Sequence, residues 1–128
     1  MRGARGRLRR GAFFGAAALC AAAVLGGLLA GCRGNKAPKP LDQLNAQEQR
    51  GHVVFQARCG QCHYDREDGA LHGPSLEGVF QKPYLHSGAP ANDERVTATI
   101  LHGHGLMPGQ PGMDPQDVED LLAYLHSL

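Results

Sequence analysis

The spacing of apolar and polar residues divides the chain into three parts. Residues 1–31 end in a long, uncharged, apolar run, and residues 32–44 are polar and interrupted by Pro38 and Pro40. A proline-containing polar segment of this kind predicts a flexible tether rather than regular structure. In residues 45–128 apolar residues recur at helical spacing, and no alternation is long enough to predict a strand. The pattern therefore predicts an all-α domain that follows an apolar leader and a tether.

Two helices are predicted from the residues that would begin and end them. Asn45 and Glu48 have the spacing of a capping box, which would start a helix that runs to about Arg58. The pair Asn92-Asp93 can cap a second helix, and Gly103 is of the residue type that commonly ends one.

A third helix is predicted at the end of the chain. Asp114-Pro115 is a strong start signal, because proline is favoured at the first helical position. Four apolar residues then recur at i, i+3, i+4 and i+7, namely Val118, Leu121, Leu122 and Leu125. This stripe predicts the face of the helix that is buried in the core.

The leader has the features of an export signal. The first ten positions hold five arginines and no acidic residue, and an uncharged apolar run follows. That run closes with Leu29-Ala30-Gly31-Cys32, which resembles the lipobox of bacterial lipoproteins. We therefore expect residues 1–31 to be a lipoprotein signal peptide and Cys32 to carry lipid. The domain would then be exported and anchored to a lipid bilayer on the periplasmic or extracytoplasmic side. An uncleaved transmembrane anchor is the alternative, because the run approaches the ~20 residues of a membrane span.

Removal of the signal peptide would change the net charge. Eight basic residues would remain against all twelve acidic ones, a formal charge of −4 rather than +1. An acidic domain without a basic cluster gives no support for nucleic-acid binding. The folded part has only about 84 residues, few aromatic residues and no Trp, so its own apolar core would be modest. A large central cofactor would stabilise such a domain.

Two cysteines would remain unmodified in the processed chain, Cys59 and Cys62, in the sequence C-G-Q-C-H. No second cysteine pair is present to complete a zinc site, and no βαβ pattern supports a thioredoxin-like redox pair. A disulfide is possible outside the cytoplasm but leaves His63 unexplained. In an exported chain, C-x-x-C-H is the attachment pattern of haem c. Two thiols one helical turn apart can reach the two vinyl groups of the porphyrin, and the imidazole of His63 then lies beneath the iron.

A second iron ligand is expected in the loop H-G-H-G-L-M-P-G-Q-P-G-M. Met107 precedes a proline in a polar loop after a helix, where a methionine is not readily explained as core filling. We therefore predict that Met107 is the sixth ligand. Met113, His102 and His104 are the other candidates, and a second histidine ligand would give the iron a lower reduction potential.

Residues from about Gln49 to Leu128 resemble the class I c-type cytochromes, which carry one haem. The matching segments occur in the family's order: G-H-V-V-F, C-G-Q-C-H, G-P-S-L, I-L-H-G, M-P and D-L-L-A-Y-L. The resemblance implies the small cytochrome c fold, with three to four helices around one covalently attached haem c. It also implies that Gly51 and Phe55 pack against Tyr124, and that the carbonyl of Pro74 accepts a hydrogen bond from His63. Tyr84 and His86 are candidates for contact with a haem propionate.

A haem iron with both His63 and Met107 bound has no position open for a substrate. We therefore expect an electron carrier, not an enzyme, that shuttles single electrons between membrane-bound donor and acceptor complexes of a respiratory chain. A haem enzyme or a gas or redox sensor with a labile sixth ligand is one alternative. A fixed cytochrome subunit of a larger oxidase or reductase is another.

Overall fold

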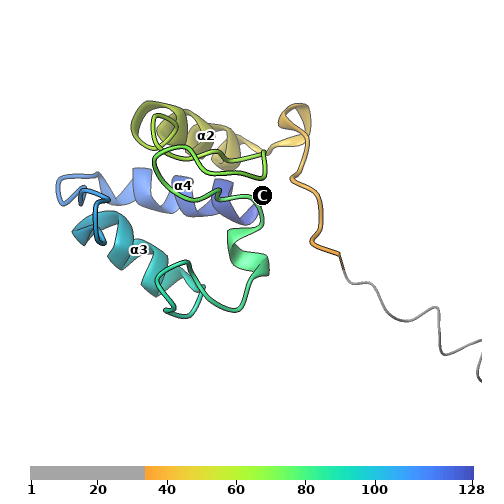
Figure 1. Ribbon diagram of the computed structural model, residues 1–128. Coiled ribbons are helices and arrows are strands. Elements are labelled where there is room, and N and C mark those ends of the chain that lie inside the picture. The colour runs from red at the N-terminus through yellow and green to blue at the C-terminus, as the bar shows by residue number, and fades with distance from the viewer. Residues whose placement is uncertain (1–33) are drawn as a thin grey trace, which may run out of the picture. The chain divides into compact units, whose positions relative to one another are not determined.

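The computed structural model describes residues 34–128, and Asn35–Leu128 form one compact unit. This unit contains the helices α2 (Ala46–Arg58), α3 (Asp93–His102) and α4 (Pro115–His126), with short 3-10 helices η1 (Leu41–Gln43) and η2 (Val79–Gln81). In Figure 1 α4 runs between α2 and α3. Residues 34–128 contain no strand, only isolated β-bridges, which confirms the predicted all-α fold. The predicted signal peptide and Cys32 lie outside the described residues.

The helices α2, α3 and α4 begin, and α2 and α3 end, where the sequence predicts. At the start of α2, Glu48 donates its backbone N–H to the Asn45 side chain at 2.9 Å, and Asn45 N–H donates to the Glu48 carboxylate at 2.7 Å. The side chains of Asn92 and Asp114 accept backbone N–H groups in the first turns of α3 and α4. Gly103 ends α3 with a φ of 77°, which a residue with a Cβ rarely adopts. The predicted capping box and both other caps are confirmed.

The helices α2 and α4 cross in close contact. A Cβ built on Gly51 would lie 1.9 Å from the backbone oxygen of Asp120 and 2.8 Å from the Cβ of Tyr124. Only glycine therefore allows the two backbones to approach this closely. One turn further along α2, the rings of Phe55 and Tyr124 pack with centroids 5.8 Å apart. The expected packing of Gly51 and Phe55 against Tyr124 is confirmed.

An ion pair joins the same two helices. Arg50 donates from Nε to Asp120 Oδ2 at 2.6 Å and from Nη2 to Oδ1 at 2.9 Å. Asp120 is only 2% exposed, and Gln116 donates a further hydrogen bond to its Oδ1 at 3.1 Å. The hydrogen bonds from Arg50 hold the pKa of the Asp120 carboxyl below its usual range. The ion pair therefore connects α2 to α4 as long as Asp120 is ionised.

The apolar core is small and centres on α4. Its buried side chains are Leu44, Phe55, Val79, Val96, Ile100, Met113, Val118, Leu121, Tyr124, Leu125 and Leu128. Three of the four residues of the predicted α4 stripe are among them, and Leu122 is half-buried against this cluster. None of the helices in residues 34–128 combines the length and apolar character that a membrane span needs.

The folded unit begins nearer to the N-terminus than the predicted boundary at residue 45. Residues 36–40 lie against the domain and make hydrogen bonds with η2 and with the end of α4. The short helix η1 then leads directly into the cap of α2. Residues 36–40 therefore differ from the flexible tether predicted over residues 32–44, because their backbone groups form hydrogen bonds with residues that are distant in sequence. Such long-range hydrogen bonds produce no local sequence pattern from which they could be predicted.

Candidate functional site

The end of α2 presents the two cysteines and the histidine in one turn. Cys59 caps the helix, and its carbonyl oxygen accepts the backbone N–H of Cys62 at 2.9 Å and of His63 at 3.0 Å. Both thiols are free, with Cys59 half-buried and Cys62 exposed. Burial raises the pKa of the Cys59 thiol to about 11, so this group is a protonated thiol at neutral pH. Two free thiols are therefore available at one end of α2.

The imidazole of His63 is held in a defined orientation. Its Nδ1 lies 2.8 Å from the carbonyl oxygen of Pro74, and because a carbonyl only accepts, Nδ1 carries the proton and donates it. This expected hydrogen bond is present, and it leaves Nε2 with a lone pair for a metal. A Cβ on Gly73 would lie 2.3 Å from Cε1 of the His63 ring. The absence of a side chain at Gly73 therefore gives the imidazole its space.

Met107 lies on a tight loop after α3. His104 and Met107 exchange two backbone hydrogen bonds, of 3.1 and 2.9 Å, around a turn in which Gly105 has a φ of 58°. A Cβ on Gly103 would lie 2.4 Å from the backbone oxygen of Met107, so the loop folds closely onto the end of the helix. The side chain of Met107 is half-buried, whereas that of Leu106 is fully exposed. The loop thus fixes the backbone of Met107 while leaving its thioether partly accessible.

The other candidate ligands lie in different surroundings. Met113 is 6% exposed and belongs to the apolar core, so it is a packing residue in this structure. His102 and His104 are exposed. Met107 is half-buried, so it is neither packed in the core like Met113 nor exposed like the two histidines.

The cysteine turn and the methionine loop lie at the same end of the domain. Arg58, the last residue of α2, donates to the side chain of Gln110 at 3.4 Å. Gln110 in turn donates its backbone N–H to the carbonyl of Ile100 in α3, at 2.8 Å. These contacts connect the segment before Cys59 to the segment after Met107.

The cytochrome c family matches residues 48–128, which include both segments. This chain belongs to the cytochrome c family. It is 36% identical over 89 residues to a cytochrome c-553-like protein of Synechocystis sp., a match that covers 66% of this chain and 72% of the relative. It is also 32% identical over 85 residues to cytochrome c oxidase subunit 2 of Alkalihalophilus pseudofirmus, covering 62% of this chain. The matched part is only 25% of the length of that subunit.

The family assigns the cofactor and the general role of this cytochrome. It is a monohaem class I cytochrome c with covalently attached haem c, and it acts as an electron carrier. The residues present fit that cofactor, because two free thiols one turn apart and an adjacent imidazole with an available Nε2 are the groups that would attach haem c and bind its iron. Several apolar side chains around the core also remain only partly buried, including Val54, Leu76, Phe80, Leu85 and Leu101.

Three features of this cytochrome were missed by sequence reasoning. Gly73 makes room for His63, and its only signal was its place in the G-P-S-L segment. Tyr124 OH donates to the Asp65 carboxylate and accepts from Arg66 Nε at 3.2 Å, a network between residues nearly 60 positions apart. The Arg50–Asp120 ion pair spans 70 positions and gave no signal either. Tyr84 and His86 are exposed, and their contact with a propionate stays a prediction.

Proposed function

We propose that this cytochrome carries single electrons through a haem whose iron is bound by His63 and Met107. The observation that carries the proposal is the hydrogen bond from His63 Nδ1 to Pro74, because it fixes the tautomer and leaves Nε2 available to bind a metal. Haem c supplies a one-electron change between ferrous and ferric iron. Cys59 and Cys62 would hold the cofactor covalently, and Met107 would supply the second iron ligand.

The proposed ligand pair decides what the haem can do. A thioether is a soft ligand that favours ferrous iron and raises the reduction potential relative to a second imidazole. With His63 and Met107 both bound to the iron, substrate and oxygen would have no access to it. The protein therefore exchanges electrons and does not transform a substrate.

Exposure of the reduced protein to carbon monoxide tests this proposal. Carbon monoxide binds ferrous haem that has an open or labile sixth position, so the expected absorption spectrum is unchanged. A shifted spectrum at neutral pH would instead assign the protein to the haem enzymes or sensors. Loss of resistance to carbon monoxide in Met107→Ala, with the wild type unchanged, would identify the residue that closes the site.

We further propose that the protein is exported, lipidated at Cys32 and held at a bilayer, where it serves membrane-bound donor and acceptor complexes of a respiratory chain. The basic and apolar leader and the lipobox-like sequence support this proposal. The acidic charge of the processed chain argues against nucleic acid as a partner. Fractionation of cells that produce wild type or Cys32→Ser tests the anchor. Wild type should sediment with membranes and the variant should not, and equal distribution would contradict lipidation.

One comparison favours a second candidate, a cytochrome fixed in a larger oxidase. The chain resembles a quarter of a cytochrome c oxidase subunit 2, so this type of domain occurs as part of a longer protein. A mobile carrier should purify free of oxidase subunits after mild solubilisation. Stoichiometric purification with an oxidase would favour the fixed subunit.

A further inference from the structure

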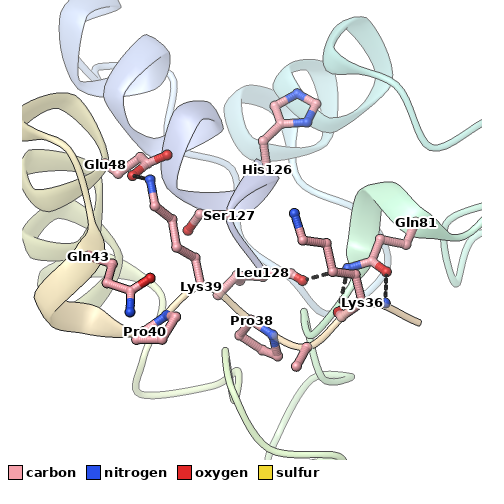
Figure 2. A pocket seen from close by; sticks show the side chains of 11 residues that line it. Lys36, Pro38, Lys39, Pro40, Gln43, Glu48, Gln81, His126, Ser127 and Leu128 are labelled. Carbon is pink, nitrogen blue, oxygen red and sulfur yellow. Dashed lines mark hydrogen bonds and ion pairs between the residues drawn. The ribbon is translucent and has the colours of Figure 1, made fainter. Parts of the chain in front are cut away.

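Residues 36–40, here called the arm, are fastened to the domain at two points. At the first, the backbone N–H of Lys36 donates to Gln81 Oε1 at 2.5 Å, and Gln81 Nε2 donates back to the carbonyl of Lys36 at 2.8 Å. The same Nε2 lies 2.9 Å from the backbone oxygen of Leu128. Figure 2 shows this side chain between the arm and the end of the chain. One glutamine thus pairs with both backbone groups of Lys36, as a neighbouring strand would.

The second fastening point is Lys39. Its backbone N–H donates to the carbonyl of Ser127 at 2.7 Å, and its carbonyl accepts from Arg66 Nη1 at 2.7 Å. Its ammonium group lies 2.6 Å from Glu48, the carboxylate that also caps α2. Figure 2 shows the Lys39 side chain reaching Glu48 beside Ser127. Lys39 is therefore bound through backbone and side chain to α2, to α4 and to the loop that holds Arg66.

The arm lies at the opposite end of α2 from the haem-attachment residues. Lys39 binds Glu48 in the first turn of α2, whereas Cys59 follows the last residue of that helix. Thirteen helical residues rise by ~20 Å. The helix α4 confirms this polarity, because it begins after the methionine loop and Ser127, which caps its end, accepts the backbone N–H of Lys39 in the arm. The domain therefore has an arm end and a haem-attachment end (Figure 1).

We propose that the arm is a docked strap that holds the cytochrome domain with its haem-attachment end directed away from the bilayer. The proposal rests on the proposed lipid anchor at Cys32. When the arm is docked, Lys36 is fixed to the domain, and four peptide units allow it to lie at most ~14 Å from Cys32. If the arm were released, Asn45 would be the first residue fixed to the domain, and it could lie up to ~45 Å from Cys32, so the domain could turn freely. Docking thus keeps the arm end of the domain close to the lipid anchor, which favours orientations with the haem-attachment end away from the membrane.

The strap is weakly enough held to be tested by a single substitution. Its hydrogen bonds are offset by the conformational entropy lost on ordering several residues. A pocket of about 730 Å³ lies between the arm and the domain, lined by arm residues and by Gln43, Glu48, Gln81, His126, Ser127 and Leu128. The arm is therefore held by polar contacts at its two ends more than by apolar packing.

Hydrogen exchange and lipid quenching on full-length, lipidated holoprotein test the strap. Gln81→Ala removes both hydrogen bonds with Lys36, and we expect exchange of the Lys36 amide to become at least roughly fivefold faster, because the loss of a single hydrogen bond of about 1 kcal/mol already has that effect. Gln43→Ala is the matched control, because Gln43 lines the same pocket without a side-chain hydrogen bond to the arm. It should leave the exchange unchanged. Neither variant should alter the haem spectrum.

The second readout is the quenching of fluorescent lipid headgroups by the haem in phosphatidylcholine vesicles. The wild type should quench weakly and Gln81→Ala more strongly, because a released domain brings its haem nearer to the surface. Equal exchange or equal quenching in the wild type and Gln81→Ala would overturn the strap. Failure of the wild type to float with vesicles would overturn the lipid anchor and the orientation with it. If the Lys36 amide is still protected from exchange in that sample, the arm is docked and only the lipid anchor has failed.

Discussion

At the scale of single residues, the account depends on the environments of His63 and Met107. The imidazole is fixed by Pro74, and the methionine by a loop that closes on Gly103. The first arrangement was predictable in part, because C-x-x-C-H and G-P-S-L are local sequence patterns. The need for glycine at position 73 was not, since the clash concerns a ring ten residues away in sequence.

Replacement of Met107 by histidine should retain covalent haem but lower the reduction potential. Imidazole favours ferric iron more than a thioether does, and we expect a fall on the order of 100 mV. Redox titration of the purified protein measures it. Met113→Leu is the matched control, because this buried methionine packs in the core and the change nearly conserves its volume. A potential that moves with Met113→Leu and not with Met107→His would show that the wrong methionine has been proposed.

A Cβ at position 73 should disturb the histidine ligand. In Gly73→Ala the new methyl group would lie 2.3 Å from the His63 ring, so the imidazole must move away from its hydrogen bond to Pro74. We expect a lower yield of haem-bearing protein and an altered ferric spectrum. Gly112→Ala is the control, because a Cβ there meets nothing within 4 Å. Identical yield and spectrum in both variants would contradict a fixed imidazole.

At the scale of elements, the contact of α2 with α4 carries much of the fold. Gly51→Ala would place a Cβ against the backbone of Asp120, so the two helices would have to separate. Overpacking of this kind typically costs about 1–3 kcal/mol, and a backbone clash belongs at the upper end. The melting temperature should fall by roughly 10–20 °C for a domain of this size. Thermal unfolding followed by circular dichroism measures this change, and Gly112→Ala should melt like the wild type.

The ion pair between these helices predicts a pH dependence of stability. The pKa of Asp120 is lowered in the folded protein, chiefly by hydrogen bonds from Arg50. The stabilisation is therefore present above the unfolded-state pKa of ~3.9 and is lost as the pH falls through the lower folded-state pKa. Asp120→Asn should be less stable at neutral pH and should lose less stability on acidification. Urea unfolding at a series of pH values measures both effects, and the exposed Glu119→Gln serves as the control. An unchanged acid limb in Asp120→Asn would contradict the prediction.

The elements were more predictable than the contacts between them. The starts of α2 and α4 follow from Asn45, Glu48 and Asp114-Pro115, because caps act within one turn of the chain. The docking of the arm on Gln81 and Ser127 was not predictable, because backbone groups in a proline-containing segment reveal nothing of partners 45 or more residues away. The helix signals are local, whereas the strap and the Arg50–Asp120 ion pair are produced by the fold.

At the scale of the whole molecule, the small core implies that the domain depends on its cofactor. The core of the folded unit consists of eleven buried apolar side chains, and several other apolar side chains around it are only half-buried. Replacement of Cys59 and Cys62 by alanine should leave little folded protein, because the covalent haem that completes the core is lost. Circular dichroism and protease resistance of the purified variant measure this. A cooperatively unfolding, haem-free domain of normal helix content would contradict it.

The most direct test of the whole account is the absorption spectrum of the purified ferric protein in the far red. If His63 and Met107 both bind iron, the spectrum is that of low-spin haem and includes the charge-transfer band between methionine sulfur and iron. Met107→Leu should abolish this band, and Met113→Leu should retain it. A high-spin wild-type spectrum without the band, or a band that survives Met107→Leu, would contradict the proposed coordination.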